Sequence, residues 1–289
     1  MKHLLRILRL SVLLLPLLAV GCRAERTADT VLTASIPPVR YLVSAITCND
    51  FPVEVLLPAG SNPESYSPTA QQLAGLEGSE LIFTTGLFDF EQELLGRTTE
   101  GIPADRIVNL STGIDLLTGH HHVSDEATHD AHYDPHIWTS PERLKRMAAT
   151  AYDAIHRRFP DSVRYTQAYE ALIGRLDEAS RQIADRLATS GTRTFVIYHP
   201  ALGYYAADYG CTQLALEDEG KEPSAQHVGD IIRRMKAEGI HTILYQQEFP
   251  AAVVAAVADD TQATASPVNP LAEDIVGELL HITDLITRP

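Results

Sequence analysis

The sequence is poor in cysteine, with 3 in 289 residues, and none of them stands in a Cys-x-x-Cys pair. This scarcity excludes a disulfide framework and a cysteine-rich zinc finger. Cys22 follows an N-terminal apolar run, which leaves only Cys48 and Cys211, far apart in the sequence. These two either pair in an oxidising compartment or remain half-buried thiols, and both alternatives stay open.

Positive charge is scarce as well. The chain has 23 Lys and Arg against 38 Asp and Glu, which gives a formal net charge of -15. A protein that binds nucleic acid needs a basic face, so we expect no nucleic-acid partner. Two hydrolase signatures are also missing, the His-Glu-x-x-His run and the serine nucleophile elbow. We therefore expect a protein that is not an enzyme and whose acidity suits a cation ligand.

Long apolar runs are limited to the N-terminus, where Leu10 to Val20 follows three basic residues. A transmembrane helix needs about 20 apolar residues, and this run is shorter. The pattern predicts an export signal over residues 1–21. Cys22 directly follows the run and a small residue, and this arrangement resembles the lipobox of bacterial lipoproteins. We therefore expect a lipid anchor at Cys22, in the periplasm or on the outer face of the cell envelope.

The remaining chain alternates short β-branched runs with helical stretches. This alternation predicts an α/β fold with two parallel-sheet lobes of about four strands each. The expected strands are residues 31–36, 53–57, 80–85 and 106–110 in the first lobe, and 194–198, 211–216, 241–246 and 262–268 in the second.

Between the two sets of strands, apolar residues recur every three or four positions after Phe159-Pro160. This period predicts one amphipathic helix from about residue 161 to 189, roughly 43 Å long, that joins the lobes rigidly. The expected domains are residues 22–159, the linking helix 160–190 and residues 191–289.

A histidine-rich loop at residues 119–136 lies in the first lobe, and the stretch 119–138 holds six of the 12 histidines. Imidazoles and carboxylates bind zinc and related ions, and a flexible tract of them supports weak, fast binding. A solvated polar loop with no specific function is the alternative. The auxiliary ligands predicted here are His120, His121, His122, His129 and His132.

Two histidines sit in more restrained surroundings. His136 ends the loop within Asp134-Pro135-His136-Ile137-Trp138, and His199 directly follows the apolar run that ends at Tyr198. Ligands of parallel α/β sheets bind beyond the carboxyl ends of strands, so one histidine from each lobe predicts a cleft site with fixed geometry.

These residues resemble the cluster A-I solute-binding proteins of ABC importers, the zinc- and manganese-type family, over nearly the whole mature chain. The motifs that carry the resemblance are Pro58 to Pro68, the histidine-rich loop, residues 134–138, His199-Pro200 with Tyr204, Tyr205 and Tyr209-Gly210, residues 219–224, and Val268-Asn269-Pro270-Leu271. The resemblance implies a metal ion in the cleft between two lobes, held by two ligands from each lobe.

Carried over residue by residue, the family's ligands fall on four positions of this chain. His136 and His199 match the second and third ligands. Glu64 stands where the family usually has histidine in a Pro-His-x-Tyr motif, and a carboxylate also binds zinc. Asn269 stands where the fourth ligand is usually aspartate, and its neutral amide is a weak ligand. Oxygen from Gln247 or Glu248, or a water, is an alternative fourth ligand.

The resemblance implies capture of a metal ion outside the cytoplasm and delivery to an ABC permease in the cytoplasmic membrane. Two imidazoles favour zinc over the alternatives Mn²⁺ and Fe²⁺. We expect a monomer that acts in zinc import. The rival functions are a metal-dependent surface adhesin, which would act in cell adhesion, and a zinc hydrolase that uses an open coordination position.

Overall fold

The computed structural model describes residues 30–96, 101–118, 133–160, 163–217, 222–249 and 251–288. Residues 31–289 form one compact unit. Cys22 and the five auxiliary histidines of residues 119–132 lie outside the described residues. Among the residues that are described, no helix is long and apolar enough to cross a bilayer.

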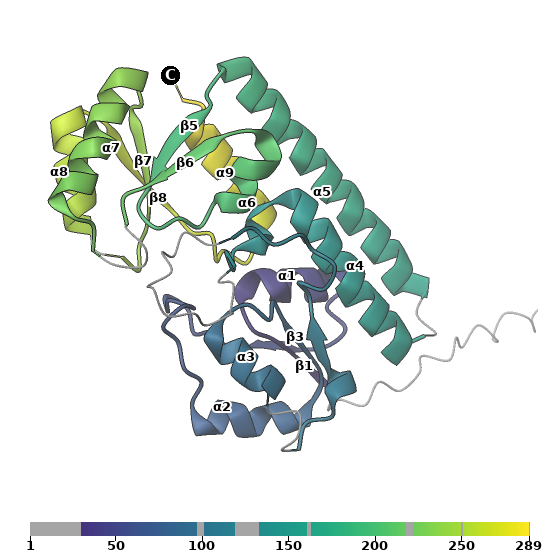
Figure 1. Ribbon diagram of the computed structural model, residues 1–289. Coiled ribbons are helices and arrows are strands. Elements are labelled where there is room, and N and C mark those ends of the chain that lie inside the picture. The colour runs from purple at the N-terminus through teal and green to yellow at the C-terminus, as the bar shows by residue number, and fades with distance from the viewer. Residues whose placement is uncertain are drawn as a thin grey trace, which may run out of the picture. The chain divides into compact units, whose positions relative to one another are not determined.

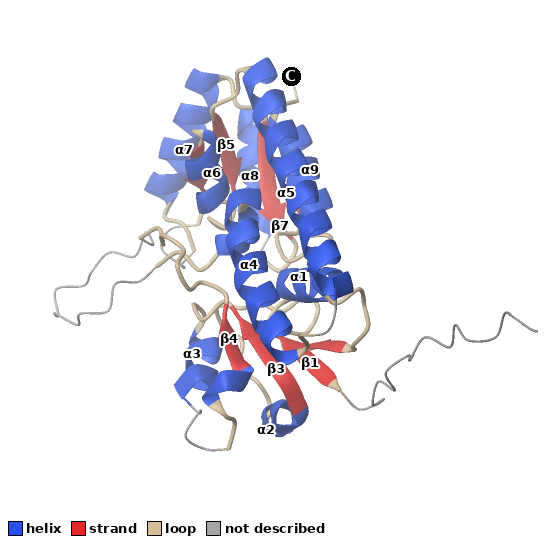
Figure 2. Cartoon of the chain, turned by 90° about the vertical axis from the view of Figure 1, so that its right-hand side faces the viewer, coloured by secondary structure: helices blue, strands red, loops and turns tan. Residues whose placement is uncertain are grey.

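Each of two sheets has four strands, and all strand pairs are parallel (Figures 1 and 2). The first has the order β2-β1-β3-β4 and the second β6-β5-β7-β8, so the second repeats the topology of the first. The predicted α/β fold with two parallel four-stranded lobes is confirmed. The strands are β1 (Val31–Ala34), β2 (Val53–Val55), β3 (Ser79–Thr84), β4 (Ile107–Asn109), β5 (Thr194–Ile197), β6 (Thr212–Ala215), β7 (Thr242–Gln246) and β8 (Thr264–Val268).

We name the elements from β1 to α4 the N-terminal lobe and those from β5 to α9 the C-terminal lobe. The N-terminal lobe contains α1 (Pro37–Ile46), α2 (Ala70–Gly75), α3 (Asp89–Gly96) and α4 (Pro141–Arg158). The C-terminal lobe contains α6 (Gly203–Tyr209), α7 (Ala225–Glu238), α8 (Ala251–Thr261) and α9 (Ile275–Ile286). The central strands β1, β3, β5 and β7 are mostly buried because helices cover the sheets, and β3 buries five of its six residues.

Helix α5 (Val163–Ser190) joins the two lobes, close to the range of 161 to 189 expected from its period. Its buried side chains recur at helical spacing, and it packs against α1 and α4 of the N-terminal lobe and against α9 of the C-terminal lobe (Figure 1). Gly191, with a φ of 73°, ends the helix in the left-handed region that glycine adopts without strain. The buried residues are Tyr165, Leu172, Leu176, Ala179, Ile183 and Leu187.

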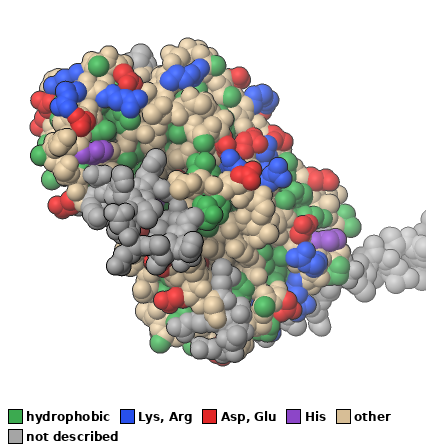
Figure 3. Space-filling model, in the orientation of Figure 1, with side chains coloured by type: hydrophobic (Ala, Val, Ile, Leu, Met, Phe, Trp, Pro, Cys, Tyr) green, Lys and Arg blue, Asp and Glu red, His purple; other side chains and the backbone are tan. Residues whose placement is uncertain are grey.

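Acidic and basic side chains are interspersed on the face of the molecule in Figure 3. Among the described residues on that face, the negative net charge is therefore not gathered into a field of one sign. Cys48 and Cys211 are both free and half-buried, which answers the question the sequence left open about these two thiols.

Candidate metal centre

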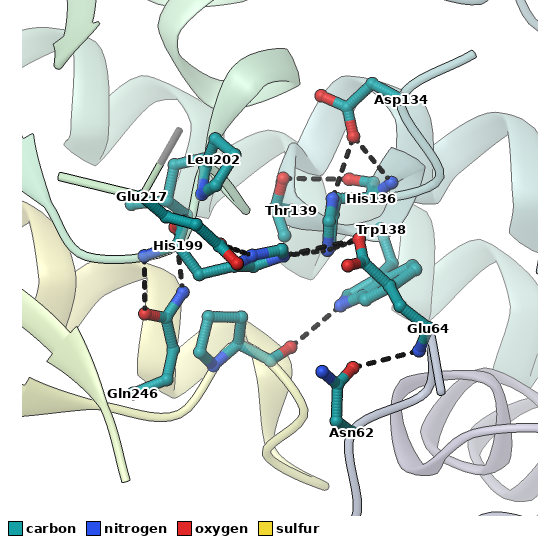
Figure 4. Close-up of polar contacts among 12 residues, drawn as sticks. Asn62, Glu64, Asp134, His136, Trp138, Thr139, His199, Leu202, Glu217 and Gln246 are labelled. Atoms are coloured by element: carbon teal, nitrogen blue, oxygen red, sulfur yellow. Dashed lines mark hydrogen bonds and ion pairs between the residues drawn. The ribbon is translucent and has the colours of Figure 1, made fainter. Parts of the chain in front are cut away.

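Three side chains that follow different strands meet at one point between the lobes (Figure 4). Glu64 lies in the loop after β2, His136 lies beyond β4, and His199 lies two residues after β5. Their ligand atoms all lie within 4.8 Å of one another. Both imidazoles are buried, whereas the Glu64 side chain is 35% exposed and reaches solvent. The structure therefore brings together three of the residues that the sequence singled out.

The spacing of the ligand atoms fits a tetrahedral ion. The Nε2 atoms of His136 and His199 are 3.3 Å apart. A zinc ion bound to two imidazoles at about 2.0–2.1 Å separates the two nitrogens by roughly 3.3–3.4 Å. Oε1 of Glu64 lies 3.4 Å from Nε2 of His199 and 3.9 Å from Nε2 of His136. Two of the three distances between ligand atoms thus match a tetrahedral zinc ion. The third, 3.9 Å, is a few tenths of an ångström longer than a tetrahedral ion requires.

His136 is held by Asp134. Oδ1 of Asp134 lies 2.8 Å from Nδ1 of His136 and accepts a hydrogen bond from its backbone N–H at 2.9 Å. A carboxylate only accepts, so Nδ1 of the neutral ring carries the proton and Nε2 keeps a free lone pair. The rings of Phe88 and Trp138 pack against the imidazole. His136 therefore has one rotamer and one tautomer suited to binding a metal ion.

His199 is supported in the same way from the C-terminal lobe. Its Nδ1 pairs with the carboxylate of Glu217 after β6. The side chain of Gln246, the last residue of β7, accepts from the His199 backbone N–H at 3.3 Å and donates to its carbonyl at 3.0 Å. Phe249 stacks on the imidazole, with ring centroids 4.8 Å apart. Both the backbone and the ring of His199 are thus fixed.

Electrostatics favour a cation at this point. Burial alone lowers the pKa of His199, but the carboxylates of Glu217 and Glu64 outweigh it and raise that pKa to about 9. In the absence of a metal ion, the same carboxylates stabilise a proton on His199. A divalent cation therefore competes with that proton for a site surrounded by negative charge.

A small cavity of about 20 Å³ borders His136 and His199. A cavity needs about 10–15 Å³ to hold one water, so this space accepts a single ion or water. Across the cavity, Nε1 of Trp138 donates to the carbonyl of Pro270 at 2.7 Å and ties the two lobes together (Figure 4). The remaining ligand candidate that lines this cavity is Glu248, which is half-buried.

Two candidates for the fourth ligand lie elsewhere. Asn269 is exposed, and its Oδ1 accepts from the Leu271 backbone N–H at 3.1 Å. Gln247 is exposed too, and both line a larger neighbouring groove of about 700 Å³ rather than the small cavity. Asn269 turns its amide oxygen to its own loop because this short side chain readily closes a turn with a backbone N–H two residues on.

Three residues that hold the histidines were not assigned any role from the sequence, namely Asp134, Glu217 and Gln246. Asp134 stands two residues before His136, and at this spacing an aspartate side chain can accept from the backbone N–H of the later residue. Glu217 and Gln246 come from the ends of β6 and β7, on either side of β5. Adjacent parallel strands end at one edge of a sheet, so polar residues at those ends were the available signal.

Comparisons with known proteins identify the family of this chain. A family model described as "Zinc-uptake complex component A periplasmic", ZnuA, matches residues 32–282. The zinc-binding protein AdcA of Streptococcus pyogenes serotype M3 is 24% identical over 255 residues, which cover 81% of this chain and 49% of AdcA. The chain thus spans about half the length of that relative.

Two further relatives match over most of their length. The high-affinity zinc uptake system protein ZnuA of Yersinia pestis is 25% identical over 86% of this chain and 85% of its own. A crystal structure of ZnuA superposes with a TM-score of 0.81 at 30% identity, over 90% of this chain and 98% of that one. The family model covers most of the chain, and the chain therefore belongs to the ZnuA family of periplasmic zinc-uptake components.

Proposed function

We propose that this protein captures zinc outside the cytoplasm and delivers it to the permease of an ABC importer. The observation that carries the proposal is the 3.3 Å separation of the His136 and His199 Nε2 atoms, with the Glu64 carboxylate beside them. Support also comes from AdcA and ZnuA, the curated relatives described above, which are named for zinc binding and zinc uptake.

The proposed ligands are Glu64, His136 and His199, with Glu248 or a water as the fourth. As the fourth ligand, the alternatives Asn269 and Gln247 rank behind Glu248 because Glu248 lines the small cavity and they do not. Two imidazoles and one carboxylate suit zinc better than Mn²⁺ or Fe²⁺, since manganese prefers oxygen ligands and iron binds such sites more weakly. A weak fourth ligand such as a water would let the bound ion leave again, as a carrier requires.

We further propose that residues 1–21 direct export and that Cys22 carries the lipid anchor. Residues 22–159 and 191–289 would then act as the two halves of the site, and the linking segment 160–190 would limit their relative motion. The histidines of loop 119–136 would raise the local zinc concentration beside His136. The protein acts as a monomer, docks on the permease and catalyses no reaction.

Equilibrium dialysis with metal analysis tests this proposal. We expect the mature chain to bind one tight equivalent of zinc, with manganese at least tenfold weaker. Deletion of residues 119–132 serves as the control, because it removes only weak binding and leaves the tight equivalent. Tight binding that persists in the His136→Ala and His199→Ala variants would contradict a cleft site, and turnover of an ester or peptide that a chelator abolishes would indicate a hydrolase instead.

A further inference from the structure

Asp134, which orients His136, is itself held by the opposite lobe. The hydroxyl of Tyr204 in α6 donates to the carbonyl of Asp134 at 2.9 Å and accepts from the Leu117 backbone N–H at 3.0 Å. The backbone N–H of Asp134 in turn donates to the Leu117 carbonyl at 2.9 Å. Thr118 and Tyr133 form an antiparallel bridge next to these contacts. The stem of the histidine-rich loop is therefore fastened to the C-terminal lobe by one tyrosine.

Gly203, the residue before Tyr204, faces the carboxylate of Asp134. A Cβ placed on Gly203 would overlap Oδ2 of Asp134 and come within 3.5 Å of its Cγ. The Asp134 carboxylate has little freedom to retreat, because Oδ1 holds both the backbone and the ring of His136. Any side chain at position 203 must therefore displace the group that fixes the His136 tautomer.

Gly203 also lies four residues after His199 and is the first residue of α6, so residues 199–203 form one short segment. This one segment carries the ligand of the C-terminal lobe and the surface on which Asp134 rests. The segment therefore links the position of His199 to that of Asp134, which holds His136.

From this contact we infer that Gly203 is a positioning residue for the metal site, which holds Asp134 and through it the His136 imidazole in the geometry that zinc requires. The inference rests on the proposed function, because the bound ion is taken to be zinc. The absence of a side chain at position 203 lets the backbone of the C-terminal lobe meet the carboxylate of the N-terminal lobe directly. Through this contact, the position of His136 in the N-terminal lobe depends on how the C-terminal lobe packs against Asp134.

The experiment compares Gly203→Ala with Gly174→Ala. Gly174 lies on the exposed side of α5, and a Cβ there would meet nothing within 4 Å. We expect Gly203→Ala to weaken zinc binding roughly 10- to 100-fold, the loss typical when a group supporting a ligand is disturbed. Gly174→Ala should bind zinc as the unaltered protein does. Equal affinity of the two variants would overturn the inference.

A double variant separates a positioning role from a loss of folding. Asp134→Ala removes the carboxylate that a Cβ at position 203 would strike. Adding Gly203→Ala to the Asp134→Ala variant should therefore leave the melting temperature unchanged and change zinc affinity by no more than about threefold. Losses that simply add would show that Gly203 acts by another route and would overturn the inference. This test also works if Gly203→Ala alone fails to fold.

A metal-free measurement keeps the inference distinct from the proposed function. In nitrogen-15 spectra of the metal-free protein, His136 should show the Nδ1–H tautomer, and Gly203→Ala should shift it toward a mixture of tautomers. Failure of the unaltered protein to bind zinc would overturn the proposed function and leave this result standing. An unchanged His136 tautomer in Gly203→Ala would overturn the inference alone.

Discussion

The N-terminal lobe brings two ligand candidates to the site, Glu64 and His136, whereas the C-terminal lobe with the same strand order brings His199. Asn269, for which the resemblance implies a ligand role, instead accepts from the backbone N–H of Leu271 in its own loop. The lobes also hold their candidate ligands differently. His199 is fixed at its backbone by Gln246 and at its ring by Glu217, while Glu64 lies in an exposed loop where Asn62 Oδ1 accepts from its backbone N–H at 2.9 Å.

Two lobes with the same strand order thus supply different sets of candidate ligands to the metal site. The C-terminal lobe offers a single, strongly braced imidazole, and the N-terminal lobe offers a second imidazole and a solvent-exposed carboxylate. The distance from Glu64 Oε1 to His136 Nε2, 3.9 Å, is the longest of the three between ligand atoms. We therefore expect the histidines to set affinity and the carboxylate side to set how the ion enters and leaves.

The largest expected loss of zinc affinity comes from removing either site histidine. This loss tests whether the two lobes contribute equally to zinc affinity through their histidines. Zinc sites of four ligands contribute about 10–16 kcal/mol, or about 3–4 kcal/mol per ligand, so His136→Ala and His199→Ala should each weaken binding roughly 10²- to 10³-fold. Competition with a chelator of known affinity measures both. His241→Ala, an exposed histidine at the opposite end of β7, is the matched control and should change nothing. A tenfold difference between the two site variants would break the symmetry of the two imidazoles.

The second test concerns the bracing of His199. Glu217→Gln keeps an acceptor for Nδ1 but removes the charge, and we expect zinc affinity to fall about tenfold, at the lower end of the range for such supporting groups. Glu222→Gln, on the same loop but exposed, is the control. Affinity that stays within twofold of the unaltered protein would mean that the brace on the C-terminal lobe is structural only.

The pH dependence tests the same brace from its electrostatic side. The pKa of His199 in the metal-free protein is raised to about 9, so below that pH zinc must displace a proton. Apparent affinity should therefore rise by up to about tenfold per pH unit and level off near pH 9. Calorimetry in buffers of different ionisation enthalpy should detect about one proton released per zinc ion at pH 7.5. Affinity that is flat between pH 7 and 9 would contradict the raised pKa.

The same shift has a consequence for the stability of the metal-free protein. A histidine whose pKa is raised on folding stabilises the fold fully below its unfolded value of about 6.5, and this contribution is lost as pH rises through about 9. The melting temperature of the metal-free protein should fall over that window in the unaltered chain and fall less in Glu217→Gln.

The smallest effects should come from the candidates for a fourth ligand. Glu248 lines the small cavity, so Glu248→Gln is expected to weaken zinc binding several-fold by removing a nearby charge. Asn269→Ala should change affinity less than twofold, because its amide serves its own loop. Isothermal titration of both variants decides between them. A larger loss in Asn269→Ala would restore the family's usual pattern of two ligands from each lobe.

Much of the fold followed from local patterns. The apolar runs at residues 79–84 and 194–197 are strands because they are buried on both faces of parallel sheets. The three- and four-residue steps from Tyr165 to Leu187 placed the long helix almost to its ends. The strand orders could not be predicted in this way, since the pairing of β1 with β3 depends on contacts far apart in the sequence.

For the site, residue type and surroundings were sufficient to single out His136 and His199, whereas Glu64 was added by the resemblance to the cluster A-I family. The supporting residues were not predictable, because Glu217 and Gln246 reach His199 only through the pairing of β6 and β7 with β5. The direction of the Asn269 side chain was likewise hidden, since a turn with Leu271 and the approach of metal compete for the same oxygen.

The chemistry that this protein can offer is present in its sequence: an acidic chain, few thiols, and isolated histidines and a glutamate in the segments that follow strands. Which of those groups meet, and at what distance, depends on the tertiary structure. The strength of a metal ligand is a property of its side chain and can be judged from one residue. The 3.3 Å between the two imidazole nitrogens is set by how the two lobes pack. The contact of Gly203 with Asp134 is part of that packing, and a glycine in a sequence does not reveal what it touches.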